Sequence, residues 1–386
     1  MTKKTTQQQF TETSSVLYLA FDLGSKKWKL GFSIGLGQKP RIRTIDFGDL
    51  KSLQKEIELA KKRFNLPDKS RVVSCYEAGR DGFWLHRYLS LEGVKNVIVD
   101  SASIEVNRRK RRAKADKLDV DSLVRMLIRY SYGEHKIWSV VRVPSVEEED
   151  RRQLSRELAT MEKERTRMRN RIRGLLVTQG IRIRGVLDLS DERLESIRTW
   201  DGHLLAPELK DRIRREWSRL VFLKEQIRAL THTRQNALNK EEQPTTDPDI
   251  EKIRQLQQLR AIGPVGAWVL VRELFGWRQF KNRRQVGSLA GLTPTPYQSG
   301  DTSIEQGISK AGIVPVRRIA IELAWGWIRY QPKSKLTLWY IKRFIDAGKK
   351  ARKVGIVAVA RRLLIDLWRF LETGVLPEGA ELKAAS

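Results

Sequence analysis

Four carboxylates occupy positions from which they could hold a divalent cation. Asp22 ends one predicted strand and Glu77 ends another, while Asp116 and Asp119 are three residues apart at the start of a predicted helix. That spacing puts both helix carboxylates on one face. Carboxylates that converge repel one another and raise each other's pKa, and a bound cation relieves the repulsion. An all-oxygen donor set suits Mg²⁺, or Mn²⁺, and either ion could act as a Lewis acid in phosphate chemistry.

Each of these acids also has a structural interpretation. An Asp before Gly commonly forms a turn, and acids in the first turn of a helix are favoured by the helix dipole. Two other acids fit the metal hypothesis less well: Asp100 ends a different strand, and Asp121 points away from the face shared by Asp116 and Asp119.

A strongly basic segment directly precedes the two helix acids. Its cations are Arg108, Arg109, Lys110, Arg111, Arg112 and Lys114, in a chain whose net charge is +29. Such an excess predicts attraction to polyanions. Eleven tryptophans argue against a disordered basic tail, and no apolar run approaches the ~20 residues that span a membrane. We therefore expect nucleic acid as the partner, with no membrane.

The elements that position the acids follow a recognisable order. Strands are predicted at residues 16–22, 28–34, 41–47, 72–76 and 97–99, and helices at 50–64, 83–91 and from 117. The order β-β-β-α-β-α-β-α is typical of an RNase H-like (RuvC-type) mixed sheet. In that fold the first and fourth strands are neighbours and the late helix packs across their ends, so the four acids would converge. We assign this domain to residues 16–143, after a mobile tail at 1–15.

Residues 144–240 are predicted to form a helical coiled-coil hairpin. Ser145 and Glu148 match a capping box, which predicts that a long helix starts there. Apolar residues then recur at heptad spacing, and a second helix repeats the pattern. This hairpin could pair protomers, or it could fold only on itself. Residues 241–249 have the composition of a linker.

Residues 250–386 are predicted to form a mainly helical domain. Gly263 and Gly266 flank a turn at a helix start, as in helix-hairpin-helix elements that bind phosphate; close packing alone also selects such glycines. Residues 287–310 are expected to form a long loop carrying Ser299. From its own residues, Ser299 fits a turn serine. A strongly helical stretch at 337–373 ends the domain, and its basic flanks suit nucleic acid or, alternatively, a membrane surface.

Cysteine and histidine usage excludes two other kinds of site. A single cysteine, Cys75, cannot form an internal disulfide, which fits a reducing compartment. One cysteine and four scattered histidines cannot form a zinc site.

Six motifs give the chain a resemblance to the DEDD transposases of bacterial insertion sequences, which are related to Piv-type DNA invertases. The motifs are FDLGSKKW, CYEAG, KADKLDVDSL, LRAIGPVGA, LAGLTPTPYQSG and ISKAG. They occur in this order within residues 17–374. The chain departs from the family at Ala115, where Thr is usual.

The resemblance implies a RuvC-like domain and a C-terminal serine domain. It implies that Asp22, Glu77, Asp116 and Asp119 bind Mg²⁺, and that Ser299 attacks DNA to give a covalent phosphoserine. It also implies a structured bridge RNA that selects donor and target DNA, and a dimer or tetramer with composite active sites. Such a protein would work in the bacterial cytoplasm, at the nucleoid.

The resemblance thus implies a bridge-RNA-guided, magnesium-dependent DNA transposase. The basic segment 108–114, Gly263, Gly266 and Lys310 are its expected nucleic-acid contacts. A Piv-type invertase would use the same residues. A RuvC-like nuclease would use water in place of Ser299, and a non-enzymatic RNA-binding protein would need none of the acids.

Overall fold

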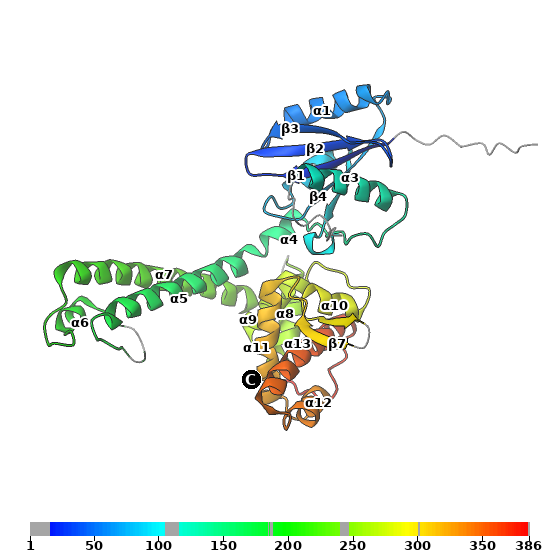
Figure 1. Cartoon of the computed structure of the whole chain (residues 1–386). Helices are drawn as coiled ribbons and strands as arrows, with labels where there is room; N and C mark the ends of the chain where they lie inside the picture. The colour runs from blue at the N-terminus through cyan, green and yellow to red at the C-terminus, as the bar shows by residue number, and fades with distance from the viewer. Residues whose placement is uncertain are drawn as a thin grey trace, which may run out of the picture. The chain divides into compact units, whose positions relative to one another are not determined.

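The computed structural model describes residues 16–104, 116–183, 185, 188–239, 247–299 and 302–384 (Figure 1). For residues 116–119, 296–299 and 302–306, only the backbone is described. The chain divides into two compact units, residues 1–143 and 144–386. None of the described helices is long and apolar enough to cross a membrane.

The first unit contains a five-stranded mixed sheet in the order β3-β2-β1-β4-β5. β1 pairs antiparallel with β2, and β2 with β3, while β4 runs parallel to both β1 and β5. The predicted element order and the pairing of the first and fourth strands are confirmed. The elements are β1 (Val16–Leu23), β2 (Lys27–Ser33), β3 (Arg41–Asp46), α1 (Leu50–Arg63), β4 (Arg71–Glu77), α2 (Trp84–Leu91), β5 (Lys95–Val99) and α3 (Asp116–Ser131).

Strand alternation divides the residues of this sheet between two cores. Leu17, Leu19 and Phe21 of β1 face one core, which includes buried side chains of α1 and α2. Tyr18 and Ala20 face the other, which α3 covers. α3 packs so closely that a Cβ on Gly31 would lie 2.4 Å from Val120 Cγ1. The period of two along β1 therefore decides which residues face α3.

The second unit begins with a helical hairpin made of α4 (Val146–Asp150), α5 (Gln153–Val177), α6 (Asp191–Ser196) and α7 (Pro207–Asn239). Leu158 on α5 packs against Ile227 on α7, whereas Ile172 clusters with Ile213, so the two long helices are antiparallel. The two long helices therefore form an antiparallel hairpin, and pairing of protomers through it stays a prediction.

The prediction of one long helix from Ser145 is wrong in one respect. The capping box is present, because Glu148 N donates to Ser145 Oγ (3.1 Å) and Ser145 N donates to Glu148 Oε2 (2.8 Å). The helix that it starts is only α4, however, and a turn at residues 151–152 precedes α5. At this turn the Arg152 guanidinium lies 4.8 Å from the centre of the Trp277 ring. Local sequence patterns cannot predict this contact, because residues 152 and 277 are far apart in the sequence.

The remainder of the second unit is a helical body with one β-hairpin, and its core gathers residues from nearly every helix. The helices are α8 (Asp249–Gln257), α9 (Pro264–Leu270), the π-helical turn η3 (Val271–Phe275), α10 (Arg283–Leu289), α11 (Val314–Tyr330), α12 (Lys335–Phe344) and α13 (Gly348–Thr373). The stretch predicted to be strongly helical, residues 337–373, consists of two helices, α12 and α13. The break coincides with Gly348, whose φ of +84° lies in the left-handed region.

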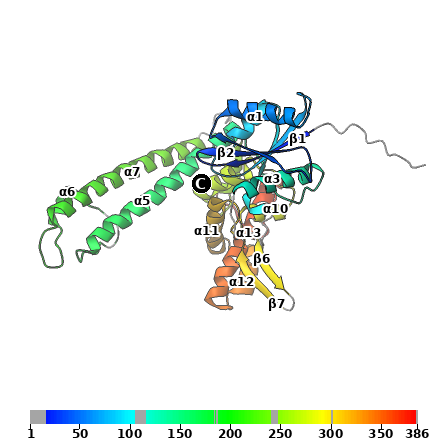
Figure 2. The same ribbon diagram turned by 45° about the horizontal axis from the view of Figure 1, so that its top comes forward.

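The expected long loop at residues 287–310 is also wrong. It contains the end of α10 followed by an antiparallel hairpin of β6 (Pro294–Ser299) and β7 (Thr302–Ile308), which Figure 2 shows extending from the helices. Threonines, Tyr297 and two isoleucines favour strands, and they outweigh the glycines and prolines that suggested a loop. Asp249, expected at the end of a linker, is instead the first residue of α8 and is buried.

Candidate functional site

Asp22 and Glu77 lie side by side at one edge of the sheet in the first unit. β1 and β4 are parallel and in register up to Phe21 opposite Tyr76, so the next residue on each strand is one of these acids. Ala20 and Cys75 both face α3, and alternation puts Asp22 and Glu77 on the same face two residues later. Asp22 is half-buried and Glu77 is exposed, so this pair borders both protein and solvent.

The direction of α3 brings its first turn to the same edge. Val120 lies over Gly31, which pairs with Ala20 of β1. Beyond the other end of the helix, Tyr132 interacts with Tyr18 near the start of β1. The pKa of Tyr18 is raised, mainly by burial, and the interaction with Tyr132 raises it further. α3 therefore runs antiparallel to β1, and its N-terminal turn, with the backbone of Asp116 and Asp119, lies toward the Asp22 end.

The donor set fits a hard divalent cation. Asp22 and Glu77 supply oxygen donors at neighbouring strand ends, the kind that Mg²⁺ prefers. The positive end of the α3 dipole also points to this edge and stabilises negative charge there. Among the residues whose side chains are described, no three acids, histidines or cysteines form a metal-binding group. The side chains of Asp116 and Asp119 lie outside that set, so the four-acid site stays a prediction.

Lys29 is a candidate site residue that the sequence analysis missed. It lies directly opposite Asp22 in the β1–β2 register. Trp28 and Leu30 point into the other core, so Lys29 shares the α3 face with Asp22. Directly opposed residues on antiparallel strands have Cβ atoms about 5 Å apart. A lysine here adds positive charge at the edge that carries Asp22 and Glu77. The short turn that Gly24 closes with Lys27 fixes this register and could have revealed it.

The two acids judged less suitable have structural partners. Asp100 Oδ1 accepts a hydrogen bond from Ala102 N at 3.1 Å and caps a short 3₁₀ helix. Asp121 forms an ion pair with Arg125 at 2.8 Å, one helical turn away. Neither contact requires a ligand.

Ser299 belongs to the second unit, where it is the last residue of β6 and pairs with Thr302 of β7. The serine therefore adjoins the tip of the hairpin, but its side chain lies outside the described set. Lys310 is exposed at the base of the same hairpin, and its carbonyl oxygen accepts from Arg317 Nη1 at 2.8 Å. The basic segment 108–114 lies outside the described residues.

The two glycines predicted to contact nucleic acid differ in environment. Gly263 caps α9 and has open space around it. Gly266 is buried, and a Cβ there would lie 2.9 Å from Leu323 Cδ2 on α11. Close helix packing is sufficient to require glycine at position 266. A phosphate contact at Gly263 stays a prediction.

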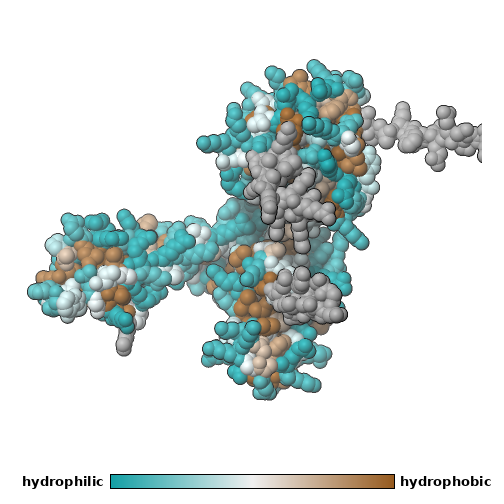
Figure 3. Space-filling model, in the orientation of Figure 1, coloured by the Kyte–Doolittle hydropathy of each residue, from teal (hydrophilic) through white to brown (hydrophobic). Residues whose placement is uncertain are grey.

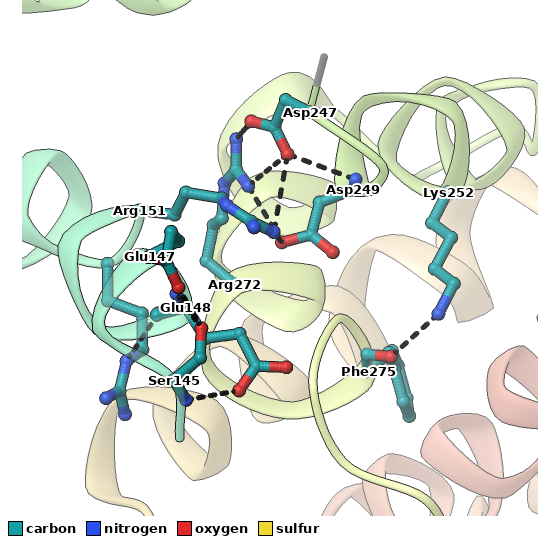
Figure 4. Close-up of polar contacts among 10 residues, drawn as sticks. Ser145, Glu147, Glu148, Arg151, Asp247, Asp249, Lys252, Arg272 and Phe275 are labelled. Atoms are coloured by element: carbon teal, nitrogen blue, oxygen red, sulfur yellow. Dashed lines mark hydrogen bonds and ion pairs between the residues drawn. The ribbon is translucent and has the colours of Figure 1, made fainter. Parts of the chain in front are cut away.

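A buried charge network lies near the base of the helical hairpin in the second unit (Figure 4). Arg272 on η3 has only 3% of its side chain exposed, and its Nη1 donates to Asp249 Oδ2 at 2.7 Å and to Asp247 Oδ1 at 2.9 Å. Arg151, just after α4, lies 3.9 Å from both carboxylates. Gly276 makes room for Asp249, since a Cβ there would lie 2.5 Å from Asp249 Oδ1. The network therefore joins three segments distant in sequence.

Arg272→Met is expected to lower the free energy of unfolding of the second unit by about 3–5 kcal/mol, because it leaves two partly buried carboxylates facing each other. Urea denaturation followed by far-UV circular dichroism would measure this. Arg260→Met is the matched control, since Arg260 pairs with Glu381 at the surface and such pairs contribute about 1 kcal/mol or less. Equal losses in the two variants would contradict a stabilising role for the buried network.

The same network predicts a pH dependence. Burial alone would raise the pKa of Asp247. Its hydrogen bonds and its attraction to Arg272 lower the pKa, and together they outweigh burial, so the pKa lies below its usual value. A carboxyl group with a lowered pKa stabilises the fold at pH values above its unfolded-state pKa, which is about 3.9 for Asp. This contribution disappears as the pH falls through the pKa of the folded state. Asp247→Asn should therefore make the stability of the second unit less sensitive to acid.

The sequence of the chain is similar to that of known proteins. Residues 253–338, from within α8 into α12, match the family model described as Transposase IS116/IS110/IS902 family. Over 379 residues the chain is 40% identical to y4rJ of Sinorhizobium fredii (strain NBRC 101917 / NGR234), whose name assigns it to the transposases, covering 95% of this chain and 94% of that one. The chain belongs to the IS116/IS110/IS902 family of transposases.

Two further relatives are named after insertion sequences. The transposase for insertion sequence element IS1111A of Coxiella burnetii is 25% identical over 233 residues, covering 60% of this chain and 61% of the relative. The transposase for IS1328 of Yersinia enterocolitica is 28% identical over 163 residues, 42% of this chain and 45% of the relative. The segment that matches the family model, residues 253–338, includes the β6–β7 hairpin that carries Ser299. The match to y4rJ covers nearly the whole chain, including the first unit. Membership of this transposase family implies DNA transposition.

Proposed function

We propose that this transposase cuts and rejoins DNA with the Ser299 hydroxyl as nucleophile, and that the reaction depends on Mg²⁺ held by Asp22, Glu77, Asp116 and Asp119. The observation that carries the proposal is the convergence in the first unit. Two carboxylates end adjacent parallel strands on one face, and the first turn of α3 is directed to the same edge. A structural role for Asp22 and Glu77 would not require this shared edge.

In the proposed reaction, Ser299 Oγ forms a bond to phosphorus and loses its proton, while the bond from phosphorus to the 3′ oxygen breaks. The released 3′ hydroxyl takes up a proton. One phosphodiester is exchanged for another, so the later attack by a 3′ hydroxyl can rejoin DNA without an external energy source. A bound Mg²⁺ or Mn²⁺ would supply Lewis acidity at the phosphate. Lys29, beside Asp22, adds positive charge for the phosphate oxygens.

A denaturing gel with wild-type protein, Mg²⁺, bridge RNA transcribed from the DNA flanking the gene, and end-labelled donor DNA tests the proposal. We expect a labelled DNA band that migrates with the protein, disappears on protease treatment and is absent with EDTA. Acid hydrolysis of that band should release phosphoserine. Cleaved DNA without any linked protein would instead support hydrolysis by a RuvC-like nuclease.

A structured guide RNA belongs to the proposal because the chain carries a net charge of +29, and chains with such an excess of cations bind nucleic acid. The DNA flanking the gene provides a direct test: a structured noncoding stretch that the purified protein binds would support guidance. Inversion by a Piv-type reaction would use the same residues, and the arrangement of the recombination products distinguishes it from transposition.

We also propose that the protein works as a dimer or tetramer through its helical hairpin. Trp200 and Phe222 in the hairpin region are 81% and 62% exposed, and Figure 3 shows apolar residues gathered on the hairpin toward its α6 end. Exposed aromatics of this kind are typical of protein interfaces. Sedimentation over a range of concentrations, for the wild type and for Trp200→Asp, tests this; a wild type that remains monomeric throughout would contradict it.

A further inference from the structure

The C-terminal helical body contains a groove of about 1600 Å³. Its walls come from α10, α12, α13 and the base of the β6–β7 hairpin, including Pro294, Gly307 and Ile308. Sites for single small molecules usually enclose about 300–1,000 Å³. The larger volume indicates an extended ligand.

The charge of the groove indicates that this ligand is an anion. Two carboxylates line it, and the structure pairs both: Glu378 with Lys335 at 2.6 Å, and Asp366 with Arg369 at 4.0 Å. Six further cations belong to the lining, so positive charge is in clear excess. These are Arg283, Arg284, Lys310, Arg343, Arg361 and Arg362.

An aromatic platform lies among these cations. Trp339 is half-buried in the groove lining, and the exposed Arg362 guanidinium lies 3.7 Å from the centre of its ring. Phe344 packs edge-on against Trp339, with 5.5 Å between ring centres. Unpaired bases stack on aromatic rings and on arginine planes. In a duplex the bases are already stacked on one another and their faces are covered, so an aromatic ring beside cations suits a single strand better.

We propose that this groove binds single-stranded nucleic acid, with bases on the Trp339–Arg362 platform and phosphates at the basic rim. The inference rests on the proposed function for its biological purpose. Pro294 lines the groove, and Ser299 is five residues further along β6, about 17 Å at the strand rise of ~3.3 Å per residue. A strand held in the groove would pass the base of the hairpin that carries the nucleophile.

The test measures binding of fluorescein-labelled 20-nucleotide strands, oligo-dT and oligo-U separately, to the full-length protein in EDTA. Trp339→Ala should weaken binding about 5- to 150-fold, the range for loss of one base-stacking contact. The matched control is Trp325→Ala on α11, which removes a 52% exposed tryptophan outside the groove lining and should change affinity less than about twofold.

A second pair of variants keeps the test valid if Trp339→Ala does not fold. Arg283→Gln/Arg284→Gln/Arg343→Gln removes three exposed groove cations, and Arg318→Gln/Arg329→Gln/Lys349→Gln removes three exposed cations elsewhere in the unit. Both triples have the same net charge. The groove triple should reduce the salt dependence of binding by about two units of slope, at ~0.7 for each lost phosphate contact to a single strand, and the control triple by less than one.

The outcomes separate this inference from the proposed function, because binding in EDTA requires no cleavage. Equal losses from groove and control variants, or no loss from either, would overturn the groove assignment even if the wild type forms a covalent DNA adduct. A selective loss from the groove variants would support it even if no adduct forms. Preference for oligo-dT would assign the groove to DNA and preference for oligo-U to the guide. Full competition by duplex DNA would contradict single-strand binding.

Discussion

Ser299→Ala is expected to produce no protein-linked DNA under conditions in which the wild type does. The hydroxyl oxygen is the atom that bonds to phosphorus in the proposed reaction, and alanine offers no replacement. DNA binding should remain within about twofold of wild type, because many basic residues contribute to affinity and the change removes no charge. The denaturing gel measures the adduct, and a gel shift in EDTA measures binding.

Two serines near Ser299 provide the controls. Ser303 is on β7, opposite Gln298 of β6, and Ser309 follows the end of β7. Ser303→Ala and Ser309→Ala should retain the adduct, since neither hydroxyl is proposed to react. An adduct that persists in Ser299→Ala but disappears in one of these variants would move the nucleophile. Free cleaved DNA from Ser299→Ala would indicate that water attacks, as in a RuvC-like nuclease.

The sheet of the first unit could be predicted because its signals are local. Leu17, Leu19 and Phe21 alternate with Tyr18 and Ala20 to give buried residues on both faces, and short glycine-containing connections separate the first strands. Once the strand order was recognised, the adjacency of Asp22 and Glu77 followed from the pairing of parallel strands. Lys29 required one more step, the register set by the Gly24–Lys27 turn.

The features missed in the second unit depend on residues far apart in sequence. The break between α4 and α5 accompanies a contact between Arg152 and Trp277, and the ordering of Asp249 accompanies its ion pair with Arg272. No periodicity in the chain reports such pairings. The hairpin at residues 294–308 was missed for another reason: its glycines and prolines resemble a loop, and only the pairing of two strands makes it regular.

Asp22→Asn is expected to reduce formation of the DNA adduct at least about a thousandfold. The substitution keeps the shape of the side chain but removes its charge, and a carboxylate–metal interaction in phosphoryl transfer contributes several kcal/mol to the transition state, where each 1.36 kcal/mol corresponds to a factor of ten in rate. Asp22 is half-buried at the end of β1, so asparagine should fit without unfolding the sheet. Single-turnover adduct formation measures the rate.

Asp46→Asn is the matched control, because Asp46 ends β3 with 77% of its side chain exposed and should leave the rate within about twofold, as usual for a surface charge. Metal binding gives a readout independent of activity. A ligand that binds only folded protein raises its stability in proportion to the logarithm of its concentration. Mg²⁺ should therefore raise the melting temperature of the wild type and of Asp46→Asn, and much less that of Asp22→Asn. Equal shifts in all three proteins, with activity retained in Asp22→Asn, would exclude Asp22 from the metal site and leave its position at the sheet edge as a structural feature.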